Sequence, residues 1–172
     1  MLADFTTFGF TYTLIPMLSI SHAVTGAFIA VKIGNPILAI PLILLSHYLE
    51  DAVPHWDAGT GLGNGSKTRR LAMSHGIVDL ILAGVLVVAM YPGIIPWTPG
   101  SGFTIPYFTP IWGAFIGLLP DFLEAPRNFW KYEPAWMGPI NRFHHSFHHS
   151  IPRILDGISP QILLLVILWI FR

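Results

Sequence analysis

Hydrophobic residues form long uninterrupted runs along this chain and leave the ionisable residues in a few short clusters. No Asp, Glu, Lys, Arg or His occurs between Leu80 and Pro120, or between Ile33 and Ser46. A helix that crosses a bilayer needs about 20 mostly apolar residues. The runs predict five such segments, at 14–34, 36–54, 70–91, 104–125 and 151–171.

Prolines interrupt the last two segments. The fourth contains Pro106, Pro110 and Pro120, and the fifth contains Pro152 and Pro160. Membrane helices tolerate such breaks where neighbouring helices satisfy the backbone. We therefore expect an all-α fold, a single integral membrane domain over 1–172, built as a polytopic bundle of about five membrane-embedded helices with the last two short or kinked.

Composition supports a chain in contact with lipid. Of the 172 residues, 53% are hydrophobic and only 10% are charged, and the mean hydropathy is +0.61. An average soluble domain is about 25% charged. The formal net charge is zero, so the chain lacks the basic face that binding to nucleic acid requires. It has no cysteine, so any metal ligands must be His or carboxylate.

The cations indicate how the chain threads the membrane. They gather in two connections, between the second and third segments and between the fourth and fifth, and none lies between the third and fourth. Cytoplasmic loops carry an excess of Lys and Arg, so both basic connections are expected inside. This places the amino terminus in the cytoplasm. The residues concerned are Lys67, Arg69, Arg70, Arg127, Lys131, Arg142 and Arg153.

A Ser-His-x-x-x-Asp unit occurs twice. The first, with His47 and Asp51, ends the second segment, and the other, with His75 and Asp79, opens the third. Residues four apart share one face of a helix. Each unit therefore points an imidazole and a carboxylate to the same side, an arrangement suited to a divalent metal.

Further candidate ligands lie at the same end of the predicted bundle. The threading places all of them on the cytoplasmic side, where buried acids need a compensating cation. For His22 an interhelical hydrogen bond is an equally good interpretation. The expected metal ligands are His22, His47, Asp51, His55, His75, Asp79 and Asp121.

A histidine tract at 143–149 leaves two interpretations open. If it is helical, His144 and His148 share a face and could complete the metal shell. The alternative is a cationic, aromatic segment near lipid headgroups, since histidine-rich composition alone is a weak metal signal.

The donor types define the expected cofactor and chemistry. Imidazoles with carboxylates favour Zn²⁺, with Mn²⁺ or Mg²⁺ as alternatives, and the number of donors allows two or more ions. A carboxylate outside the metal shell can act as general base or orient a ligand, and a guanidinium can bind phosphate. The candidates for these roles are Glu50, Asp57, Glu124 and Arg70.

The order of these motifs resembles the membrane-bound metal-dependent hydrolase family of prokaryotic inner membranes. The resemblance covers 20–125 and rests on a Ser-His in the first segment, the two units with Pro54-His55-x-Asp57, and Leu119-Pro120-Asp121. More distantly, the His-x-x-x-Asp spacing is similar to that of the zinc-dependent phospholipases C. These likenesses imply a helical fold and hydrolysis of a phosphoester.

We therefore expect a membrane-embedded metal-dependent hydrolase that acts on an ester, most plausibly a lipid phosphoester, at the cytoplasmic headgroup level. A metal ion or proton transporter is the main alternative, because His and Asp chains also build ion pathways. A catalytically silent metal-binding membrane protein is a third. The expected partner is membrane lipid, and the sequence leaves the oligomeric state open.

Overall fold

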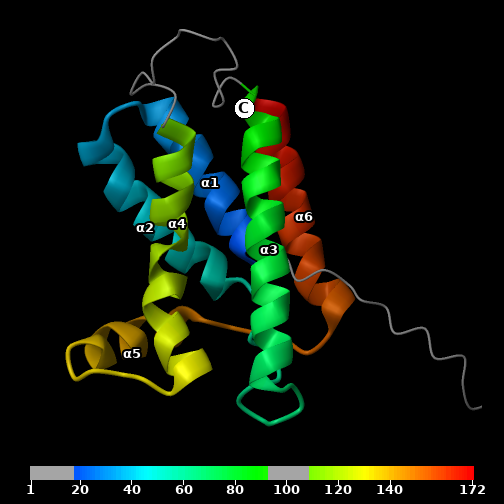
Figure 1. Ribbon diagram of the computed structural model, residues 1–172. Helices are drawn as coiled ribbons and strands as arrows, with labels where there is room; N and C mark the ends of the chain where they lie inside the picture. Colours follow the sequence, from blue (N-terminus) through cyan, green and yellow to red (C-terminus); the bar gives the residue numbers. More distant parts are fainter. Residues whose placement is uncertain (1–17, 93–108) are drawn as a thin grey trace, which may run out of the picture.

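The computed structural model describes residues 18–92 and 109–172 (Figure 1). Within these ranges the regular structure is helical, which confirms the expected all-α class. A π-helical turn, Pro126–Trp130, follows the fourth helix. The helices are α1 (Leu18–Ile33), α2 (Pro36–Ala52), α3 (Arg69–Met90), α4 (Thr109–Ala125), α5 (Met137–Phe147) and α6 (Ile154–Phe171).

Local sequence signals set the boundaries of α2 and α3. The Asn35 side chain accepts a hydrogen bond from the Ile37 amide, and Pro36 occupies the first helical position. Both features are typical of helix starts. Thr68 caps α3 by accepting from the Leu71 amide. The loop between Ala52 and Thr68 therefore joins the polar carboxyl end of α2 to the capped amino end of α3.

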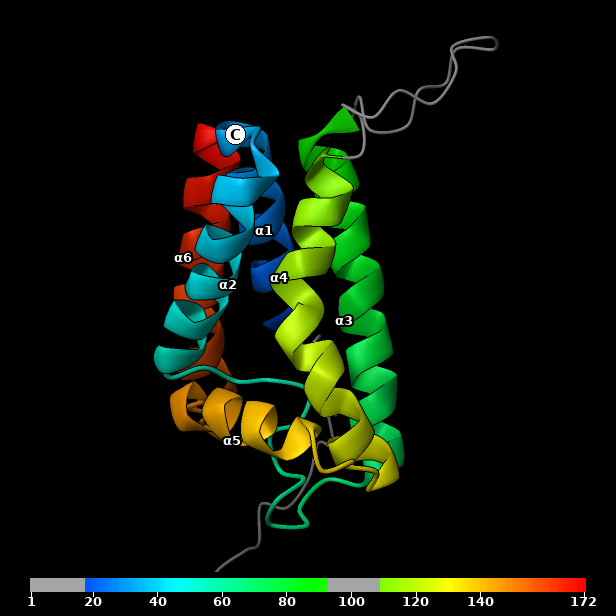
Figure 2. The ribbon, with the colours of Figure 1, turned by 90° about the vertical axis from the view of Figure 1, so that its left-hand side faces the viewer.

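Helix α1 lies at the centre of the bundle. It packs against α2, α3, α4 and α6, and its Ala23, Val24, Ala27 and Ala30 are buried. Helix α5 runs across one end of the bundle, roughly perpendicular to α3 and α4 (Figures 1 and 2). That end carries the amino termini of α1, α3 and α6 and the carboxyl termini of α2 and α4.

Glycines allow α1 and α4 to approach closely. A Cβ on Gly26 would overlap the Gly113 carbonyl oxygen, and a Cβ on Gly117 would overlap the carbonyl oxygen of His22. Small residues permit such backbone contact between apolar helices. The contact brings the first turns of α1 beside the last turns of α4, where the polar residues lie.

Among the described residues, two helices, α3 and α6, are long and apolar enough to cross a membrane. Only 22% of each apolar stretch is buried inside the molecule, so most of these side chains face outward, unlike those of a core helix in a soluble protein. Helices α1, α2 and α4 have 16 or 17 described residues, fewer than the length needed for a full span.

The five-segment arrangement stays a prediction beyond these two helices. The expected segments 14–34 and 104–125 both begin outside the described residues. The apolar runs in the sequence also gave no indication of α5, because this helix of 11 residues is too short and too polar to form such a run.

Candidate metal centre

Ten ionisable side chains meet at the end of the bundle that α5 crosses. They come from α1, α2, the loop after α2, α4, α5 and the residue that follows α5, and most of them are buried. Among the described residues, seven of the ten form three overlapping groups whose donor atoms could hold a metal ion. The side chains are His22, His47, Glu50, Asp51, His55, Asp57, Asp121, Glu124, His144 and His148.

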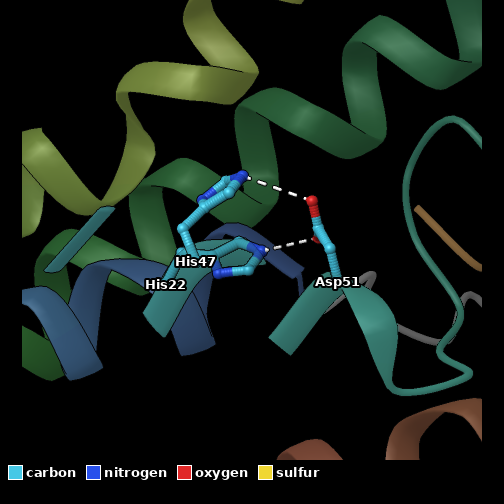
Figure 3. A group of neighbouring side chains, drawn as sticks. All are labelled: His22, His47 and Asp51. Atoms are coloured by element: carbon cyan, nitrogen blue, oxygen red, sulfur yellow. Dashed lines mark ion pairs between the residues drawn. The ribbon is translucent and has the colours of Figure 1, made fainter. Parts of the chain in front are cut away.

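The first group joins α1 to α2 through the carboxylate of Asp51 (Figure 3). His22 Nε2 lies 3.2 Å from Asp51 Oδ1, and His47 Nε2 lies 3.3 Å from Asp51 Oδ2. On the other side of the His22 ring, Nδ1 lies 3.0 Å from Glu50 Oε2. All three members of the group are buried, so an ion here would be enclosed by protein.

The second group joins α2, α4 and α5. The Nε2 atoms of His47 and His144 lie 3.2 Å apart, and each lies 3.8 Å from Asp121 Oδ1. Asp121 is the most exposed member, with 23% of its side chain accessible. Asp121 is therefore the member of this group that is in contact with the surface.

The third group lies at the loop after α2 and consists of Asp51, His55 and His148. His148 Nε2 also lies 3.0 Å from Asp57 Oδ2. Burial acts to lower the pKa of His148, but Asp51 and Asp57 outweigh it and raise that pKa to about 10. Burial likewise acts to raise the pKa of Asp57, and the hydrogen bond with His148 holds it below its usual range.

Like His22 beside Glu50, three further imidazoles are oriented through Nδ1, which leaves Nε2 directed into the cluster. His47 Nδ1 donates to the Gly117 carbonyl at 2.7 Å, and His55 Nδ1 donates to the Val53 carbonyl at 2.7 Å. His144 Nδ1 lies 3.4 Å from Glu124 Oε2. Metal-ligating histidines commonly hold the second ring nitrogen in this way, which fixes the tautomer and the ring orientation.

Backbone hydrogen bonds attach the loop after α2 to the segment after α5. The His55 amide donates to the His149 carbonyl at 3.0 Å, and the Ile151 amide donates to the His55 carbonyl at 2.7 Å. The His149 amide donates to the Asp51 carbonyl at 3.1 Å. This pairing brings His148 beside Asp57, although the two are 91 positions apart along the chain.

The residues fit a divalent cation. Glu50, Asp51, Asp57, Asp121 and Glu124 bring five carboxylates together, and of the fixed cations only Arg127 pairs with one of them, Glu124, among the described contacts.

Several donor atoms at the centre of the cluster also lack hydrogen bonds. Among the described residues, His55 Nε2 is buried without a hydrogen-bond partner, and His22 Nε2 and Asp51 Oδ1, 3.2 Å apart, form an ion pair that does not meet hydrogen-bond geometry. Buried acids and imidazoles without good hydrogen bonds are costly, and coordination of a positive ion satisfies both.

The second Ser-His-x-x-x-Asp unit lies outside the three groups. Asp79 is buried, and its Oδ2 accepts a hydrogen bond from the Ser19 amide at 2.7 Å, in the first turn of α1. His75 is half-buried, and its ring centre lies 6.5 Å from that of Trp56. Arg70 is exposed on the first turn of α3. The roles predicted for these three residues stay predictions.

The four histidines of the tract at 143–149 have two different environments. His144 and His148 enter the donor groups, whereas His145 and His149 are exposed. Helical spacing grouped His144 with His148, and His145 with His149, but His148 lies just past the end of α5 in extended conformation.

Two features of the site were not identified from the sequence. One is the Gly117 carbonyl that orients His47. The other is Arg127, which pairs with Glu124 and which charge patterning alone assigned to membrane topology. An Arg three residues after a Glu at the end of a helix was the only available hint, because such residues lie on one face.

Comparison of the chain with family models, curated proteins and solved structures returns no match. The resemblance drawn from the motifs therefore stays a prediction, and the geometry of the site carries the functional argument.

Proposed function

We propose that this chain is a membrane-embedded, metal-dependent hydrolase that cleaves a phosphoester of a lipid. The observation that carries the proposal is the convergence of five imidazoles and five carboxylates at one end of an apolar helical bundle. The positive-inside rule places that end, and the amino terminus, in the cytoplasm. The resemblance of the motifs adds the prokaryotic inner membrane, and the apolar runs add an arrangement of about five membrane-embedded helices.

The proposed ions are Zn²⁺, with Mn²⁺ or Mg²⁺ as alternatives, because imidazole and carboxylate donors suit these metals. Asp51 belongs to two of the donor groups and His47 also belongs to two, which supports a site for more than one ion. A bound divalent ion would lower the pKa of coordinated water toward about 7 and polarise a phosphoryl oxygen.

The surrounding residues have distinct proposed roles. Glu50 and Glu124 each face an Nδ1 atom, so they orient His22 and His144. This leaves Asp57, which pairs with His148 and lies outside the three donor groups, as the proposed proton acceptor. These assignments follow from which atom each acid faces.

A cation is also needed beside the substrate phosphate. Arg127 is partly exposed and pairs with Glu124, next to the donors of α4 and α5. We assign it the neutralisation of phosphate charge. This role was predicted for Arg70, which lies on the first turn of α3.

The test is hydrolysis by the purified, full-length protein in detergent. We expect metal to copurify and phosphatidic acid, phosphatidylglycerophosphate or a chromogenic phosphodiester to be cleaved. Chelation and Asp51→Ala should both abolish turnover. Asp156→Ala is the matched control, because Asp156 is an exposed acid at the same end of the bundle.

Turnover that is indifferent to chelation and to Asp51→Ala would contradict the proposal. Uptake of metal into proteoliposomes, without hydrolysis, would support a transporter instead. Stoichiometric metal without hydrolysis or uptake would support a catalytically silent metal protein.

A further inference from the structure

Helix α5 carries two rows of side chains with different environments. Met137, Asn141 and His144 are buried against the bundle, and His144 is a donor of the metal centre. The residues that directly precede these three, Trp136, Ile140 and Phe143, form a second row. That row is exposed, at 62%, 37% and 54% of each residue. With 3.6 residues per turn, the rows lie about 100° apart around the helix.

The exposed row continues into the apolar outer face of α2. The Tyr48 ring packs against Phe143 and Phe147, with ring centres 5.2 and 5.4 Å apart. On the same helix, Leu45 and Leu49 are exposed. The row on α5 is therefore the end of a larger apolar surface, not an isolated patch.

Residues near this row have the composition of a bilayer interface. Trp130 and Tyr132 are exposed just before α5, and Lys131 and Arg142 are exposed cations. Trp and Tyr concentrate where a protein meets lipid headgroups, and Lys and Arg complement anionic lipids. The nearby Glu133 pairs with Asn141 and Arg127, so it does not oppose such lipids as an unpaired charge.

The orientation of α5 also agrees with a position at the membrane surface. It runs across the end of the bundle, roughly perpendicular to α3 (Figure 2), one of the helices long and apolar enough to cross a membrane. If α3 crosses the bilayer, α5 lies in the plane of the headgroups. Amphipathic helices bind membranes in this orientation.

We propose that Trp136, Ile140 and Phe143 insert into the headgroup layer of a lipid bilayer, so that one helix both anchors the molecule at the membrane surface and supplies His144 to the metal centre. The anchor holds the metal centre within one helix diameter of the lipid headgroups, about 10 Å. The inference rests on the membrane location in the proposed function and is independent of hydrolysis.

The absence of cysteine makes a direct test available. Single variants Ile140→Cys, Ser146→Cys and Val166→Cys carry a nitroxide label in vesicles of phosphatidylcholine and phosphatidylglycerol. Collision with apolar oxygen, compared with a water-soluble nickel chelate, reports whether each label is in lipid or water. Ser146 is an exposed polar residue of α5, and Val166 is an exposed apolar residue of α6. Metal content equal to that of the unlabelled protein shows that each variant has folded.

We expect the oxygen-to-nickel ratio at position 140 to be several-fold higher than at 146 and below that at 166. Trp136→Cys, one turn earlier in the same row, gives a second reading. An aqueous label at 140 with a lipid-exposed label at 166 would overturn the anchor alone. Aqueous labels at both would contradict the membrane location itself. An immobilised label at 140 that neither reagent reaches would show that protein covers the row, which also overturns the inference.

Discussion

The two Ser-His-x-x-x-Asp units have the same spacing and enter different environments. Asp51 lies within 3.3 Å of imidazole nitrogens of His22, His47 and His144. Asp79 is equally buried, but it accepts a hydrogen bond from the Ser19 amide. Helical spacing therefore determined which side chains share a face, and the neighbouring helices determined what that face binds.

The physical difference is what each carboxylate meets. Asp51 faces His47 of its own helix and two imidazoles, His22 and His144, that α1 and α5 bring to it. Asp79 faces the start of α1, where the first backbone N–H groups have no partner within the helix and carry partial positive charge. A carboxylate satisfies either environment. The carboxylate of the same motif can thus contribute to a metal site, or it can cap the amino terminus of a neighbouring helix.

The largest expected effect separates the two acids. Asp51→Asn should weaken Zn²⁺ binding by more than about 100-fold, because loss of a group that only supports a ligand already costs about 10–100-fold. Asp79→Asn is the matched control and should retain metal. Elemental analysis after dialysis against limiting Zn²⁺ measures both. Equal loss from the two variants would mean that the units are equivalent.

A smaller effect is expected from the glycines that position the first unit. Gly117→Ala places a Cβ against the His22 carbonyl and shifts the oxygen that orients His47. Such overpacking costs about 1–3 kcal/mol. On α3, Gly84 faces open space, so Gly84→Ala should be neutral or stabilising by up to about 1 kcal/mol. Thermal unfolding in detergent compares them, and an unchanged midpoint for Gly117→Ala would contradict the close packing.

Removal of the cap on α1 should cost less. Asp79→Ala leaves the Ser19 amide without its acceptor, and loss of a helix cap costs about 1 kcal/mol. Asp79→Asn should lose less, because an amide oxygen still accepts a hydrogen bond. Hydrogen exchange at Ser19 and thermal unfolding measure the difference. Identical behaviour of the two variants would argue against capping.

The smallest effect is expected at the second histidine. His75→Ala should leave the metal content unchanged and alter stability by no more than about 0.5 kcal/mol, as is usual for residues outside a core or network. His47→Ala is the matched comparison and should lose metal. Loss of metal from His75→Ala would place that imidazole in the centre after all.

Much of the fold could be predicted from apolar runs. The runs indicated the apolar character of α3 and α6 and a segment beginning at 36, where α2 begins. Helix α5 could not be predicted in this way, because a short amphipathic helix leaves no long apolar run. Its direction across the bundle depends on packing between distant segments.

The candidate site was predictable where local spacing controls it. His47 and Asp51 lie on one turn of α2, and charge patterning placed their partners at the same end. The pairing of His148 with Asp57 depends on backbone hydrogen bonds between remote segments, which spacing does not encode. The hydrogen bond from His47 to the Gly117 carbonyl could not be predicted, because its acceptor is a backbone atom that every residue has.

The pairing of the His55 segment with residues 149–151 also controls when the centre can form. His22, His47 and Asp51 leave the ribosome well before His144, which lies 93 positions after Asp51. Until α5 has been synthesised and docked, two of the five imidazoles of the cluster, His144 and His148, are missing. If the cluster binds a metal as proposed, loading therefore follows the closure of these long loops, which is slow and entropically costly.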